Sequence, residues 1–119
     1  MSMKNYMDGI HYENTLDSFL KECQVLVDDH MKQYPWESKL SVNKGRRYDK
    51  IVSEEIHEGP EWKSRHSERV WAFVDKTNGD ILKPDGWKKP AKHARGNIYE
   101  EDRMLFVNHS GPAYMDTIK

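Results

Sequence analysis

Residues 69–99 read RVWAFVDKTNGDILKPDGWKKPAKHARGNIY, and this stretch decides the predicted fold. Its first part, residues 70–75, alternates Val and Ala with bulky aromatics, which is the period of two of a β-strand. Asn78 and Gly79 tolerate positive φ angles and are typical of a hairpin turn. An apolar pair then begins a return strand, and Pro84 either ends this strand or marks it as an edge strand. The stretch therefore predicts a β-hairpin.

The residues after this hairpin are basic. Pro90 suits the first position of a helix and Gly96 the position just after its end, so residues 90–95 are predicted to form a short basic helix. In such a helix Lys88, Lys92 and Arg95 lie on one face.

Upstream, apolar residues recur at steps of three and four from Leu16 to Tyr34, which predicts an amphipathic helix. Asn14 is placed to cap its first turn and Pro35 to end it. Cys23 falls on the apolar face, where a buried thiol behaves as a small apolar group.

The remaining segments are assigned from their local composition. We expect a polar connection over residues 35–47, a strand over 48–56, a polar loop over 57–68 and a short strand over 104–107. The predicted fold class is α+β, with one long N-terminal amphipathic helix packed on a small, mainly antiparallel sheet.

The same assignment divides the chain into three parts. Residues 1–12 show no sustained period and are expected to form an irregular arm. Residues 13–110 are expected to form a single α+β domain, and residues 111–119 a C-terminal tail.

Composition supports one small folded domain. Of the 119 residues, 36% are hydrophobic and 33% charged, and the 4 Trp, 6 Tyr and 3 Phe argue against disorder. The single Cys excludes an internal disulfide and a Cys-rich zinc module. No apolar run is long enough to cross a membrane, and no signal peptide is evident, so we expect a soluble protein without a membrane partner.

One cluster of cations suggests a binding function. Five Lys or Arg residues and a His fall within 13 residues, opposed only by Asp85, with Trp87 among them: Lys83, Lys88, Lys89, Lys92, His93 and Arg95. Cations that follow phosphates, beside an aromatic ring that stacks a base, are the ingredients of nucleic-acid binding. A second basic group, formed by Lys44, Arg46, Arg47 and Lys50, lies beside this cluster if the strands pair.

Other interpretations remain open at this point. Trp87 is equally compatible with a structural lid that fills the core, and the lysines with an ordinary solvated surface. The six His residues are scattered without a paired spacing, so no metal site is predicted. No Gly-rich phosphate loop or nucleophile motif occurs, so we expect no cofactor and no enzymatic activity.

These residues also carry a resemblance. The segment GRRYDKIV and the hairpin with its basic continuation are similar to a family of small uncharacterised proteins of tailed bacteriophages. The matching positions are Gly45, Arg47, Tyr48, Asp49, Ile51, Val52, Phe73, Asp75, Gly79, Asp80, Lys83, Trp87, Pro90, Ala91, Lys92, Arg95 and Asn97. The chain departs from the pattern at residues 83–86 and at His93. The resemblance implies a phage origin but no activity.

Taken together, the sequence predicts a small phage accessory protein that binds nucleic acid or another polyanion through its basic, Trp-containing loop. The alternative is a non-enzymatic structural or interaction protein, either a minor virion component or a binder of a host protein. The expected location is the host bacterial cytoplasm or the virion.

Overall fold

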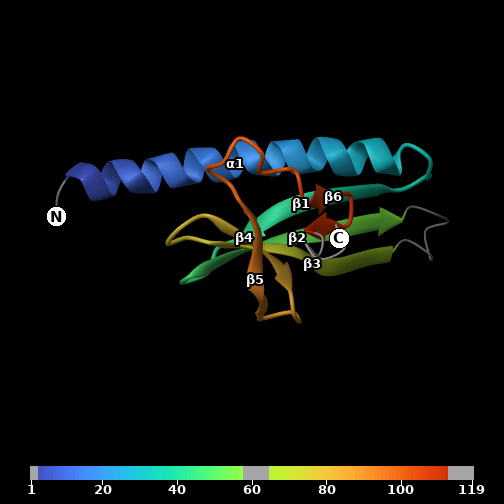
Figure 1. Cartoon of the computed structure of the whole chain (residues 1–119). Helices are drawn as coiled ribbons and strands as arrows, with labels where there is room; N and C mark the ends of the chain where they lie inside the picture. The colour runs from blue at the N-terminus through green and yellow to red at the C-terminus, as the bar shows by residue number, and fades with distance from the viewer. Residues whose placement is uncertain (1–2, 58–64, 113–119) are drawn as a thin grey trace, which may run out of the picture.

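The computed structural model describes residues 3–57 and 65–112. A helix, α1, packs on one face of a five-stranded antiparallel sheet, and two very short strands pair beside it (Figure 1). The elements are α1 (Met3–Met31), β1 (Glu37–Asn43), β2 (Tyr48–His57), β3 (Arg65–Asp75), β4 (Asp80–Pro84), β5 (Pro90–Asn97), β6 (Val107–Asn108) and β7 (Gly111–Pro112). The predicted α+β class, with an N-terminal helix on an antiparallel sheet, is confirmed. Within the described residues, no helix combines the length and apolar character needed to span a membrane.

The helix begins earlier than the sequence predicted. The expected irregular arm is helical from Met3 onward, and Asn14 lies inside α1 rather than at its cap. The reason is Tyr12, which is buried four residues before Leu16 and so extends the apolar face by one turn. Residues 1–2 lie outside the described part of the chain.

The main core lies between α1 and the sheet. It contains Tyr12, Leu16, Phe19, Cys23, Val27, Leu40, Ile51, Trp71, Ala72, Val74, Ile81, Ile98 and Val107. Burial raises the pKa of the Cys23 thiol, which fits its predicted place on the apolar face. A smaller cluster of Val70, Phe73 and Leu82, with Tyr48 against it, lies on the other face of the sheet.

The predicted hairpin is confirmed as β3 and β4, with Val74 opposite Ile81. The alternation within β3 is interrupted, however. Ile51 of β2 pairs with Ala72, whereas the next residue pairs with Val70, so Trp71 is the extra residue of a β-bulge. The bulge places Trp71 in the helix-side core together with Ala72, although strict alternation puts these two residues on opposite faces.

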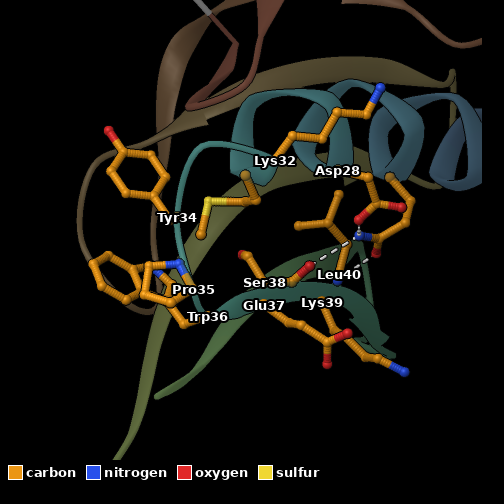
Figure 2. A pocket seen from close by; sticks show the side chains of 11 residues that line it. Asp28, Lys32, Tyr34, Pro35, Trp36, Glu37, Ser38, Lys39 and Leu40 are labelled. Carbon is orange, nitrogen blue, oxygen red and sulfur yellow. Dashed lines mark hydrogen bonds between the residues drawn. The ribbon is translucent and has the colours of Figure 1, made fainter. Parts of the chain in front are cut away.

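The residues between α1 and β2 were predicted as a polar connection, but residues 37–43 form β1. The buried residues of β1 are Ser38 and Leu40, and because Ser38 is polar, the sequence does not show the alternation of apolar and polar residues that marks a strand. The burial of the residues along β1 does alternate. The outer edge of β1 is completed by the amide of Gln24 on α1, which accepts from the Leu40 amide N–H at 2.8 Å and donates to the Ser38 carbonyl at 2.9 Å (Figure 2). A residue of a parallel neighbouring strand forms the same two bonds. β1 is therefore fixed by a tertiary contact.

The predicted helix over residues 90–95 is wrong, because this segment is β5. A helix of so few residues pays the cost of nucleation for very few hydrogen bonds, whereas the second edge of β4 supplies backbone partners. Ala94 lies opposite Leu82 and Gly96 opposite Ile81, with register shifts on either side of Leu82.

Three smaller differences concern the other connections. The polar loop expected over 57–68 is partly strand, since β2 reaches His57 and β3 begins at Arg65; residues 58–64 lie outside the described part. The strand expected over 104–107 is reduced to β6, with residues 104–106 in a turn. The expected tail begins with β7, and residues 113–119 are not described.

Candidate polyanion-binding surface

The predicted basic cluster lies on the hairpin of β4 and β5, whose turn points away from α1 (Figure 1). The Asp85 amide N–H donates to the Lys89 carbonyl at 2.7 Å and closes this turn. Trp87 at its tip is 47% exposed. Four of the predicted cationic residues are also exposed: Lys88, Lys89, Lys92 and His93. The turn therefore presents one indole and several cations to solvent.

Two of the predicted site residues lie elsewhere. Arg95 is buried, because β5 is a strand and does not place Arg95 on a common face with Lys88 and Lys92. Lys83 is half-buried, and its Nζ lies 3.4 Å from the Pro112 carbonyl of β7. Neither residue belongs to the exposed part of the cluster.

The second basic group approaches the first through Lys50. The Lys50 Nζ, from β2, lies 4.3 Å from the centroid of the Trp87 ring, which is cation–π distance. Arg46 and Arg47 are exposed in the turn between β1 and β2. The Arg47 guanidinium lies 5.1 Å from the Tyr48 ring and 3.3 Å from the Asp75 carboxylate. The sequence grouped Lys50 with the arginines but gave no signal of its contact with Trp87.

A polar network that the sequence did not predict lies beside this second group. The Asp49 side chain is fully buried and accepts from the Tyr12 hydroxyl at 2.8 Å and from the Gly45 amide N–H at 3.1 Å. Lys44 and Lys76 approach its oxygens at 3.4 and 3.6 Å. Burial and the Asp49 carboxylate raise the pKa of Tyr12, so its hydroxyl stays protonated. The network stabilises the turn and holds α1 to the sheet.

The chain as a whole matches one family model, described as a family of unknown function (DUF7717), over residues 4–115. The chain belongs to this family. No curated protein matches it, and no solved structure does. The resemblance to an uncharacterised family is thus confirmed at the level of DUF7717, without any assigned activity.

Several positions of the recognised pattern have structural roles in this DUF7717 chain. Asp75 accepts from the amide N–H and the hydroxyl of Thr77, which shapes the turn after β3. Asn97 of β5 donates to the Asn78 carbonyl at 2.8 Å and to the Asp80 carboxylate at 3.1 Å, which ties β5 to the same turn. These residues position the β4–β5 hairpin and do not themselves form a site.

A hollow of about 680 Å³ in this DUF7717 chain lies between the C-terminal half of α1 and β1, far from the basic hairpin in sequence (Figure 2). Tyr34 and Trp36 stack along one side with their centroids 5.2 Å apart. Its charged lining mixes signs: Asp28 accepts from Gln24, and Lys32 pairs with Asp29. A mixed lining of this kind does not select an anion.

The described residues contain no group of three or more His, Cys, Asp or Glu side chains that could hold a metal ion. His30 and His109 do meet, but their rings stack face to face with centroids 3.6 Å apart. Stacked rings direct their nitrogen lone pairs side by side, whereas ligands of one metal ion must converge on it.

Proposed function

We propose that this protein binds nucleic acid or a similar polyanion through the turn of the β4–β5 hairpin. The observation that carries the proposal is the half-exposed Trp87 beside the exposed Lys88, Lys89 and Lys92. Indole rings lose water readily and stack on bases, while ammonium groups follow phosphates.

The charge distribution supports this assignment. Lys88, Lys89 and Lys92 are exposed in a segment, residues 83–95, whose one acidic residue is Asp85, so the hairpin surface is basic although the chain has a net charge of −1. Lys50 holds one more cation against the Trp87 ring, and Arg46 and Arg47 extend the positive surface to the β1–β2 turn. Such a local cluster steers a polyanion toward one side of the molecule.

The origin of the protein is also a proposal. The resemblance of the GRRYDKIV segment and the hairpin to phage proteins supports a bacteriophage source, with the protein acting in the host cytoplasm or carried in the virion. No enzymatic step is part of the proposed function.

The test is binding of a fluorescently labelled oligonucleotide over a series of salt concentrations. We expect affinity to fall steeply with salt, and the double variant Lys88→Glu/Lys89→Glu to weaken binding and flatten this dependence. The matched control is Lys21→Glu/Lys32→Glu, which makes the same charge change on two exposed lysines, one on α1 and one in the turn that follows it. Absence of binding at low salt, or equal loss in both double variants, would overturn the proposal.

A second candidate function is that of a structural or interaction protein, as a minor virion component or a binder of a host protein. It is favoured by exposed apolar side chains away from the hairpin, of which Val25 and Leu105 are 69% and 66% exposed. Mass spectrometry of purified phage particles tests whether the protein is a virion component. If the protein is absent from the particles, this version of the second candidate function is excluded.

A further inference from the structure

The loop between β5 and β6 crosses α1 (Figure 1). An apolar hollow of about 430 Å³ is lined by residues of α1 and of this loop. Val25, Leu26 and Met104 form its apolar lining, and Glu22 and Asp29 its charged border. Leu105, the neighbour of Met104 in the chain, adds another exposed apolar side chain. An exposed apolar hollow with a polar rim is typical of a protein interaction site.

This hollow is held in shape by Arg103. Its guanidinium donates to Glu22 at 2.9 Å, to the Ser18 hydroxyl at 3.0 Å and to the Ile98 carbonyl at 3.0 Å. The pair with Arg103 also lowers the pKa of Glu22, so this border residue stays charged in neutral solution. The hollow is therefore preformed, and binding there requires little ordering of the chain.

The surroundings of the hollow carry more acidic than basic residues. Residues 21–32 and 98–106, which lie around it in the chain, together contain six Asp or Glu against three Lys or Arg. The surface that complements it has an apolar centre with basic neighbours. The turn of the β4–β5 hairpin has this composition, because Trp87 is exposed next to Lys88 and Lys89.

We propose that the hollow on α1 binds the Trp87 turn of a second copy of this chain. Figure 1 shows the turn pointing away from α1, so a chain cannot fill its own hollow. Two copies carry almost no net charge and hence repel each other little, while their acidic and basic sides attract. The contact joins two different surfaces, so each added copy leaves one hollow and one turn open for the next.

The test uses the full chain in sedimentation velocity at low and high salt. We expect wild-type protein to associate in a concentration- and salt-dependent way. Trp87→Ala removes the inserted side chain, and Val25→Asp places a charge in the hollow at an exposed position of α1. Each is expected to raise the dissociation constant about thirtyfold, as for a central Trp of an interface.

Mixing these two variants gives the decisive result. Trp87→Ala retains an intact hollow, and Val25→Asp retains an intact turn, so the mixture is expected to form a 1:1 heterodimer that does not grow further. A wild-type chain that stays monomeric, or a wild-type assembly unaffected by Val25→Asp, would overturn the proposal and leave the hollow to a different partner.

The test of self-association can fail or succeed independently of the proposed nucleic-acid binding. Val25→Asp lies outside the basic hairpin and is expected to bind the labelled oligonucleotide as the wild type does. Because both ligands use Trp87, adding oligonucleotide should dissociate the wild-type assembly. An assembly that withstands saturating oligonucleotide would contradict the shared use of this side chain.

Discussion

Two ends of the same sheet use similar residues in opposite ways. At one end, the turns after β1 and β3 are tied down by Asp49 and Asp75, which accept hydrogen bonds from backbone and side chains. At the other end, the turn between β4 and β5 is closed by a hydrogen bond from the Asp85 amide N–H to the Lys89 carbonyl, and its charged side chains are exposed. We call these the tied end and the exposed end.

The comparison separates structural cations from candidate binding cations. Lys44 pairs with Glu13 and Asp49, and Lys76 donates to the Gly45 carbonyl, so both are engaged within the fold. Lys88 and Lys89 lie exposed on the turn. The chain has 19 Lys and Arg residues. Whether a cation lies next to a buried carboxylate distinguishes the two roles better than the number of cations in a stretch of sequence does.

The largest expected effect is at the tied end. Asp49→Ala removes the acceptor of the buried Tyr12 hydroxyl and of the Gly45 amide, and it leaves Lys44 and Lys76 without this carboxylate. We expect a loss of about 3–5 kcal/mol in the free energy of unfolding, measured in urea. The matched variant at the exposed end, Asp85→Ala, should cost less than about 0.5 kcal/mol. Equal losses of stability in the two variants would contradict the distinction between the tied end and the exposed end.

Glycines provide the next comparison, because one in each end has a positive φ. Gly79 has φ of +84°, and a Cβ there meets the Tyr99 ring at 2.6 Å. Gly86 has φ of +120° with open space around it. We expect Gly79→Ala to cost about 2–3 kcal/mol, from backbone strain and crowding, and Gly86→Ala about 1 kcal/mol from strain alone. Thermal unfolding of both variants measures the difference.

A smaller effect depends on pH. Burial alone raises the pKa of Asp75, but the bonds from Thr77 and the Arg47 guanidinium outweigh it and hold this pKa below its usual value. The stabilisation is therefore present above the unfolded pKa near 4 and is lost as the pH falls through the folded value. Asp75→Asn should be less stable than wild type at pH 7, by about 1–2 kcal/mol, with the gap closing in acid. A gap that widens in acid would contradict this account.

A small effect on stability is expected at Trp87. Because its indole is half-exposed, Trp87→Ala should lower the free energy of unfolding by less than about 1 kcal/mol, against about 3–5 kcal/mol for the buried Trp71→Ala. Oligonucleotide binding should fall even though folding is retained. A loss of several kcal/mol for Trp87→Ala would instead favour the structural lid.

The sequence predicted the elements whose signals are local. The apolar period of α1, the strand from Tyr48 and the Asn78-Gly79 turn each lie within a few neighbouring residues. The sequence did not predict β1 and β5 as strands because each depends on hydrogen-bond partners in another element, namely Gln24 of α1 for β1 and the edge of β4 for β5.

For the candidate site too, the sequence predicted the features that depend on neighbouring residues and missed those that depend on the tertiary fold. The exposure of Trp87 and its neighbouring lysines agrees with a polar turn, which the composition of the segment indicated. Arg95 was placed on the surface because a helix was assumed, whereas strand geometry buries it. Asp49 gave no signal, since a charged residue in a polar segment is ordinarily exposed, and its burial depends on Tyr12 from 37 residues earlier in the chain.

The order of the strands has a consequence for how the chain folds. The five strands follow one another across the sheet in chain order, so their pairing closes only short loops. Arg103, in contrast, reaches back 85 positions to Ser18 on α1. Because long loops are slower and entropically costlier to close, the sheet is expected to assemble first and the Arg103 contact last. Substituting Arg103 should then accelerate unfolding and leave the refolding rate almost unchanged.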